Sequence, residues 1–203
     1  TKQNIYWGDK MIHRRAKFND IFPSPTLKNI VIISCGGLNN EKSTLISDCI
    51  ADMHAYGDSQ CFPLYYYEEQ KKAGKTLFDG AKEHTEYVKR DGITNFILEQ
   101  AREIYGIRVT KEDIFYYVYG LLHSPDYRTR YANDLKKMLP RIPFVDEPKD
   151  FWAFSKAGRK LAELHINYET VPPAEGVTVK GDESGFYKVE KMRFPSKEDK
   201  SRI

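Results

Sequence analysis

The sequence predicts an α+β fold, with mixed strands at both ends that flank a central helical segment of about four helices. A run of β-branched residues lies at 29–34, and strand-like patterns return at 176–180 and 186–194. Between these patterns, apolar residues recur at helical spacing from residue 93 to residue 164. The order of strands, then helices, then strands indicates the α+β class.

Two segments in the first third of the chain are predicted to form strands. Residues 29–34 (NIVIIS) are almost continuously apolar and lead to a pair of glycines, which indicates a buried strand followed by a turn. Residues 61–67 (CFPLYYY) indicate a second strand, in which Pro63 marks an edge or a bend. The apolar residues from Leu45 to Met53 leave both a short helix and a strand open.

Two other segments are predicted to lack regular structure. Residues 1–28 are polar and aromatic and contain Pro23 and Pro25, which favours an extended connector. Residues 68–91 have few aliphatic side chains and many charges, which is typical of a solvated loop.

The helical centre carries clear start and stop signals. Gly106 closes the first helix, Thr110 and Asp113 match a capping box, and Pro125 suits the first turn of a helix. His123, just before that start, is interpreted as a packing or capping residue. The four predicted helices cover residues 93–105, 110–122, 124–139 and 151–164.

The composition is that of an ordinary globular chain. The 203 residues carry a net charge of +3, with a pI of about 8.6. This mildly basic balance permits DNA binding but does not by itself indicate it, since nucleic-acid domains commonly have a pI above about 9. The sequence has no apolar stretch long enough for a membrane span.

No catalytic or metal-binding constellation emerges from the residues. The three cysteines show no CxxC spacing, and the five histidines form neither an i, i+4 pair nor an HExxH motif. A serine nucleophile would need a GxSxG-type elbow, which is absent. Pro172-Pro173 lacks the neighbours of an adenine methyltransferase loop. We therefore expect no enzymatic activity, no catalytic residue and no metal site in this chain.

A glycine loop at residues 36–43 (GGLNNEKS) is close to a phosphate-binding P-loop but fails at one position. Glu41 stands where the pattern needs glycine, and its carboxylate would repel phosphates. A P-loop NTPase is thus kept only as an unfavoured alternative. A plain polar turn and a DNA contact remain equally open for the side chains of this loop, which are Asn39, Asn40, Lys42 and Ser43.

Two further groups of cations are candidate DNA contacts, although solvated surfaces often look the same. The first group lies in the predicted loop and consists of Lys71, Lys72, Lys75, Lys82, Lys89 and Arg90. The second lies on or just after the third predicted helix and consists of Arg128, Arg130, Lys136, Lys137 and Arg141.

Several longer runs resemble a known family. Residues 52–68 (DMHAYGDSQCFPLYYYE) and 113–128 (DIFYYVYGLLHSPDYR) are similar to the C-terminal target recognition domain of single-polypeptide (Type ISP) restriction–modification enzymes and of related predicted helicases. Residues 141–144 and 187–194 also fit. The resemblance implies that residues 1–28 connect to a preceding methyltransferase region. Residues 29–203 would then be the recognition domain, ending short of the family's C-terminus.

The resemblance also implies the function. The ligand would be double-stranded DNA, read in a sequence-specific way, and the partner would be the methyltransferase domain of the same polypeptide. The parent enzyme would carry a nuclease, an ATP-driven translocase and an N6-adenine methyltransferase, using S-adenosylmethionine, ATP and Mg, with no cofactor in this chain. We expect a monomeric fragment of a bacterial cytoplasmic protein. The alternative is an intramolecular docking module that couples methyltransferase and translocase without reading bases.

Overall fold

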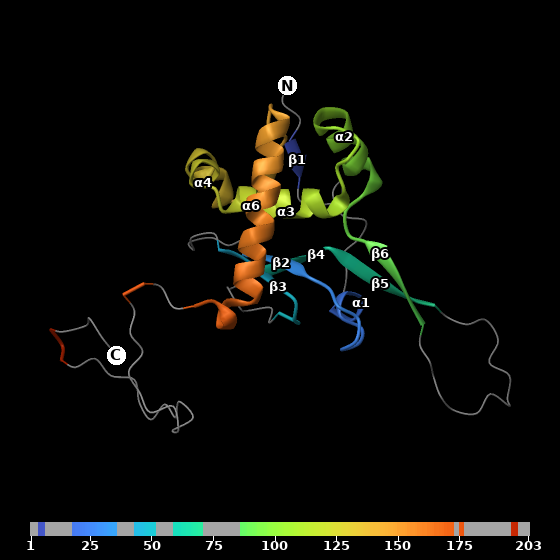
Figure 1. Ribbon diagram of the computed structural model, residues 1–203, viewed down its shortest axis with the longest axis horizontal. Coiled ribbons are helices and arrows are strands. Elements are labelled where there is room, and N and C mark those ends of the chain that lie inside the picture. Colours follow the sequence, from blue (N-terminus) through green and yellow to red (C-terminus); the bar gives the residue numbers. More distant parts are fainter. Residues whose placement is uncertain are drawn as a thin grey trace. The chain divides into compact units, whose positions relative to one another are not determined.

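The computed structural model describes residues 4–6, 18–35, 43–51, 59–70, 86–172, 175–176 and 196–198. The chain divides into two compact units, Thr1–Glu169 and Thr170–Ile203. The described helices and strands belong almost wholly to the first unit and confirm the α+β class. Figure 1 labels most of them.

The described strands form three small antiparallel sheets. One sheet has the order β3-β2-β4, a second pairs β1 with β7, and a third pairs β5 with β6. The strands are β1 (Asn4–Tyr6), β2 (Val31–Cys35), β3 (Thr44–Ser47), β4 (Ser59–Pro63), β5 (Tyr65–Gln70), β6 (Glu86–Asp91) and β7 (Arg141–Pro143).

The described helices are short except for three. They are α1 (Phe18–Ile21), α2 (Asn95–Tyr105), α3 (Lys111–Leu122), α4 (Pro125–Arg130), α5 (Ala132–Leu135), α6 (Pro148–Ile166) and the 3-10 turn Tyr168–Thr170. The predicted caps are confirmed: the Thr110 hydroxyl accepts from the Asp113 backbone N–H while the Asp113 carboxylate accepts from that of Thr110, and the Ser124 hydroxyl caps α4.

Both faces of the three-stranded sheet carry buried apolar side chains. Ile32, with Ile46 and Phe62 beside it, faces the main core, which also contains the buried sides of α2, α3 and α6. Val31 and Ile33 face a smaller core with Ile21. The alternation follows from the two-residue period of a strand and explains why residues 29–34 are almost continuously apolar.

Helices α3 and α6 meet at two glycines. Figure 1 shows α3 crossing the long helix α6. A Cβ added at Gly120 would overlap the carbonyl oxygen of Phe154, and one at Gly158 would overlap that of Tyr116. Glycine at both positions therefore allows the two backbones to approach more closely than any other residue would.

Three tyrosine hydroxyls from three helices hold one extended segment, residues 141–145. Tyr127 donates to the carbonyl oxygen of Arg141 at 2.7 Å, Tyr117 to that of Pro143 at 2.6 Å, and Tyr105 to that of Val145 at 2.9 Å. Burial is the main cause that raises the pKa of each phenol, so all three stay protonated and can donate. The segment is thus fixed against the helices by donors at every second residue.

Two parts of the predicted secondary structure were wrong. Residues 68–70 and 86–91 lie in a paired ribbon and not in a loop, with Glu68 opposite Val88. The pattern does not reveal it, because residues 68–70 and 86–91 are exposed or half-buried on both faces and lack the apolar alternation that signals a strand. The single helix predicted over residues 124–139 is instead broken at Tyr131, whose φ of −108° and ψ of 17° separate α4 from α5.

The structure also describes part of the stretch from Leu45 and part of residues 1–28, but almost none of the predicted C-terminal strands. The ambiguous stretch from Leu45 contains a strand, β3, followed by bends at Asp48 and Cys49. Within the range expected to be a connector, Asn4–Tyr6 pairs with β7 and Phe18–Ile21 forms a helix. The strands expected at 176–180 and 186–194 lie outside the described residues, except for Gly176 in a turn.

Candidate nucleic-acid interface

The most cationic candidate is the stretch from Pro125 to Arg141, called here the basic segment. It contains five cations against two carboxylates, Asp126 and Asp134. Pro125 occupies the first turn of α4, where its missing N–H costs nothing, and Tyr127 is buried beneath the helix. Tyr127 thus fixes the backbone from the buried side, and four of the five cations are exposed.

The five cations of the basic segment have different surroundings. Arg128 donates from Nε to the Leu122 carbonyl oxygen at 2.9 Å, which satisfies the end of α3. Arg141 is partly buried in β7. Arg130 lies 5.8 Å from the centre of the Tyr131 ring, and Lys136 and Lys137 are exposed after α5. Arg130, Lys136 and Lys137 are therefore the members whose charged ends are best placed for phosphate groups.

The second cationic group only partly falls within the described residues. Lys89 and Arg90 lie on β6, whereas Lys71, Lys72, Lys75 and Lys82 lie outside the part of the chain that the structure describes. Lys89 Nζ is 3.4 Å from the centre of the Tyr65 ring, and Arg90 Nε is 3.1 Å from a carboxylate oxygen of Glu68. Both described cations thus contact neighbouring side chains of the ribbon.

The whole stretch 68–91 also has no excess of charge. Its six cations are balanced by six carboxylates, Glu68, Glu69, Asp79, Glu83, Glu86 and Asp91. Because non-specific affinity for DNA depends on neutralising phosphates, this stretch is a weaker candidate for phosphate binding than the basic segment.

The glycine loop connects two antiparallel strands. Asn39, Asn40 and Lys42 lie outside the described residues, and Ser43 is partly buried just before β3. A P-loop needs a helix at this point, whose N-terminal N–H groups face the phosphates. The chain instead continues into strand β3, which pairs with β2. This topology adds to the argument from Glu41 against a nucleotide site.

A pair of histidines lies beneath the start of β3. His123 Nδ1 is 2.8 Å from the carbonyl oxygen of Tyr119, and its Nε2 is 3.1 Å from that of Thr44. The Tyr119 hydroxyl is 2.6 Å from Nδ1 of His165. Burial, with help from Arg128 and His165, lowers the pKa of His123, so the ring is neutral near pH 7. These contacts support the interpretation of His123 as a packing residue that links α3 to the strand after the glycine loop.

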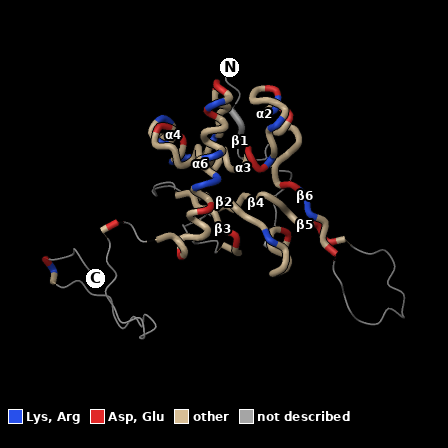
Figure 2. The backbone as a smooth tube through the Cα atoms, in the orientation of Figure 1, with Lys and Arg blue, Asp and Glu red and all other residues tan. Residues whose placement is uncertain are grey.

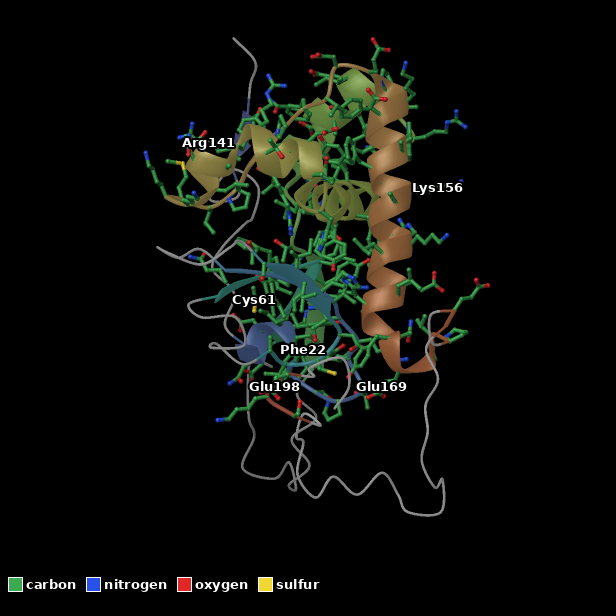
Figure 3. All side chains as sticks on the ribbon, turned by 90° about the vertical axis from the view of Figure 1, so that its left-hand side faces the viewer. Phe22, Cys61, Arg141, Lys156, Glu169 and Glu198 are labelled. Atoms are coloured by element: carbon green, nitrogen blue, oxygen red, sulfur yellow. The ribbon has the colours of Figure 1, made fainter. Side chains whose placement is uncertain are left out.

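One cationic feature was missed from the sequence. Lys149, Lys156 and Lys160 are exposed on α6, at spacings of seven and four residues that place them along one line of the helix. The spacing is present in the sequence, but the lysines alternate with apolar residues of the predicted core stripe, and such a stripe indicates packing and not a cationic surface. Figure 3 shows Lys156 on the outer side of α6, on the opposite side from Arg141 in that view.

The described residues contain no cluster typical of a metal site. Among them, no group of three His, Cys, Asp or Glu side chains could hold a metal ion, and Cys49 and Cys61 are free thiols. Within the same residues, none of the helices combines the length and the apolar character needed to cross a bilayer.

Comparison with known proteins places the chain in a family. Residues 1–203 match the model of the Type ISP C-terminal specificity domain, as the resemblance implied. No curated protein matches the chain. The solved structures that are similar include the ATP-dependent Type ISP restriction–modification enzyme LlaBIII bound to DNA, with 33% identity, a TM-score of 0.63, and coverage of 80% of this chain and 10% of that chain.

Two further similar structures are also complexes with DNA. The DrdV–DNA complex shares 32% identity with a TM-score of 0.62, over 76% of this chain and 14% of that chain. A nuclease-deletion mutant of the Type ISP enzyme LlaGI, bound to a DNA substrate mimic, shares 38% identity with a TM-score of 0.54, over 76% of this chain and 12% of that chain. The chain thus spans about a tenth to a seventh of the length of these proteins. It belongs to the family of Type ISP C-terminal specificity domains.

Proposed function

We propose that this chain is the sequence-specific DNA recognition module of a restriction–modification enzyme and binds double-stranded DNA directly. The observation that carries the proposal is the basic segment, in which four of the five cations are exposed on a backbone that the buried Tyr127 holds in place. The DNA-bound state of the similar structures supports it.

The two tasks of a DNA reader would fall to different residues. The phosphate contacts would come from Arg130, Lys136 and Lys137, which would thereby set the affinity and the register on the duplex. Contacts of this kind carry no information about base sequence. Asn39 and Asn40 of the glycine loop, with Lys42 and Ser43, have side chains that can hydrogen-bond base edges. Loops that connect strands suit base reading, since they can vary without disturbing the scaffold.

The rest of the reaction would belong to the parent enzyme. In this proposal, the module holds DNA against the methyltransferase domain of the same polypeptide, which flips the target adenine into its own pocket. S-adenosylmethionine, ATP and Mg would serve the methyltransferase, translocase and nuclease of the parent, and none would bind here. This chain would contribute binding and orientation, with no catalytic residue.

Titration of the 203-residue chain with a fluorescent duplex tests the proposal. We expect binding that weakens steeply with salt, with the logarithm of the binding constant falling linearly with the logarithm of salt concentration. Substitution of Lys136 and Lys137 by Gln should reduce the slope by about 1.8, at about 0.9 for each phosphate that is no longer neutralised. Absence of binding at low salt would rule out direct recognition of DNA by this chain.

A second candidate function, intramolecular docking, is favoured by exposed apolar side chains on and just after α2. Phe96 is 52% exposed, Ile104 is 43% exposed, and Ile107 just beyond the helix is 77% exposed. Large apolar side chains on a surface mark protein interfaces where they form a patch. If Phe96→Ser and Ile104→Ser uncouple the activities of the parent while duplex binding is unchanged, docking is a function of these side chains. DNA binding would then be a separate function.

The nucleotide-binding alternative can be tested separately. We expect no binding of ATP to the chain, because Glu41 and strand β3 replace the glycine and helix of a P-loop. Micromolar binding of ATP that is abolished by Lys42→Ala would reverse this conclusion.

A further inference from the structure

Helix α6 presents a row of lysines to solvent. Lys149, Lys156 and Lys160 fall within about 40° of one another around a helix of 3.6 residues per turn, and the row is about 16 Å long at 1.5 Å per residue. All three are exposed, and between the first two the line is flanked by the exposed side chains of Ala153 on one side and Trp152 on the other. Figure 2 shows the charged residues along α6.

The row points directly away from the core. Gly158, which contacts α3, lies about 180° around the helix from Lys149. The buried side chains of Phe151, Ser155 and Ala162 lie on the same side as Gly158. Because close contact between glycines fixes α6 against α3, the lysines are carried on a rigid support. Such a support reduces the conformational entropy that is lost when a ligand binds.

The neighbouring arginine does not belong to this row. Arg159 turns toward α3, where its guanidinium lies 3.5 Å from Glu112, 3.4 Å from Asp113, and 4.2 Å from the centre of the Tyr116 ring. Among the described residues, in contrast, no carboxylate forms an ion pair with Lys149, Lys156 or Lys160. Carboxylates of α3 thus offset the charge of Arg159, and no described carboxylate pairs with the three lysines.

The spacing of the lysines does not favour the helix itself. Lys156 and Lys160 are an i, i+4 pair of like charge, which destabilises a helix by a few tenths of a kcal/mol. The first carboxylate after the row, Glu163, comes three residues beyond Lys160. Glu163 is an i, i+3 neighbour of Lys160 and can offset part of this repulsion, whereas Lys149 and Lys156 have no carboxylate three or four residues away within α6. Local stability therefore gives no reason for Lys149 and Lys156, whereas binding of a polyanion does.

We propose that Lys149, Lys156 and Lys160 form a second phosphate-binding surface, which contacts the backbone of duplex DNA. This inference rests on the proposed function and adds to it a site distinct from the basic segment. A row about 16 Å long matches roughly five base pairs at 3.4 Å per pair, so three ammonium groups can reach several phosphates. Contacts of this kind add affinity and salt dependence but no preference for sequence.

Lysine footprinting of the 203-residue chain tests the surface. The chain is acetylated with and without a saturating duplex at low salt, and each lysine is followed by peptide mass spectrometry. Lys149, Lys156 and Lys160 should be protected by DNA, whereas Lys28, which is exposed near α1, serves as the internal reference. Equal acetylation of the row and Lys28 in the presence of DNA would contradict the proposal.

Charge variants provide a second measurement. The triple variant Lys149→Gln, Lys156→Gln, Lys160→Gln should reduce the salt slope of duplex binding by about 2.7, at about 0.9 for each phosphate that is no longer neutralised. Replacement of all three by Arg should preserve the slope. A control variant removes the same amount of charge from three exposed positions outside the row, by the substitutions Lys28→Gln, Arg108→Gln and Lys197→Gln. It should change the salt slope less than the variant of the row does. Thermal melts followed by circular dichroism check that each variant is folded.

The outcomes separate this inference from the proposed function. If the wild-type chain binds duplex and the Gln variant binds with the same affinity and slope, the lysine row is not a DNA contact, but the proposed function stands. If the wild-type chain does not bind duplex, the proposed function fails as well. A reduced slope in the Gln variant with rescue by Arg supports both.

Discussion

The two faces of α6 differ in what they contribute. The inward face meets α3 through Gly158 and packs Phe151 into the core, and no residue larger than glycine fits at the contact. The outward face carries Lys149, Lys156 and Lys160 and contributes little to packing. The comparison shows that one helix can serve both as scaffold and as binding surface, with the division set by its period of 3.6 residues. Substitutions on the two faces should therefore have separable effects.

The largest effect is expected at the glycine contact. Helix propensity alone predicts that Gly158→Ala stabilises the chain by about 1 kcal/mol. The overlap with the Tyr116 carbonyl oxygen predicts the opposite, a loss of about 2 to 3 kcal/mol, because the backbone cannot yield as a side chain can. Urea denaturation measures the difference. Ala153→Gly on the outward face is the control, with an expected loss of about 1 kcal/mol. Stabilisation by Gly158→Ala would show that the helices are not in close contact.

A smaller effect is expected where tyrosines hold the segment 141–145. Tyr117→Phe removes the donor to the Pro143 carbonyl oxygen and should reduce the free energy of unfolding by about 1 to 2 kcal/mol. Tyr168→Phe, at an exposed position, should have no measurable effect. Equal stabilities for the two variants, measured by denaturant titration, would argue against a structural role for the hydroxyl of Tyr117.

The titration of His123 should change the free energy of unfolding by less than the loss of the Tyr117 hydroxyl does. Because burial lowers the pKa of His123 in the folded state, the unfolded state takes up the proton first as pH falls below about 6.5. Stability should then decline until the pH reaches the folded-state pKa, at less than about 1.4 kcal/mol per pH unit. His123→Gln should remove this component in melts between pH 7 and pH 5. An unchanged pH profile in the variant would assign the decline to other groups.

The smallest effect on stability is expected in the basic segment. Lys136→Gln with Lys137→Gln should change the free energy of unfolding by less than about 0.5 kcal/mol, because both side chains are exposed. Denaturant titration beside the binding titration gives both numbers for one variant. A large loss of stability would place these lysines in the scaffold and remove them from the candidate interface.

The scaffold was largely predictable from the sequence because it depends on local signals. The capping box of Thr110 and Asp113 and the β-branched run before the glycine loop each define an element without tertiary information. The break at Tyr131 and the β5–β6 ribbon were not predictable in this way. Both depend on contacts between distant residues, such as the bond from Tyr127 to Arg141 and the pairing of Tyr65 with Asp91.

The candidate interface was less predictable. A basic residue in the sequence does not reveal whether its side chain is free for DNA. Arg128 donates a hydrogen bond to the Leu122 carbonyl oxygen at the end of α3, whereas Lys136 is exposed. The runs that carry the family resemblance also prove to be mostly structural, since residues 113–128 contain the buried tyrosines of the core. The sequence therefore indicates the family more readily than the residues that would read DNA.

Exchange of the domain between enzymes tests the central claim most directly. This segment would replace the corresponding part of a related full-length Type ISP enzyme, and the methylated sites would be mapped across a host genome. The proposed recognition function predicts that the methylated motif changes to a new sequence while methylation persists. An active chimaera that still methylates the original motif would contradict it.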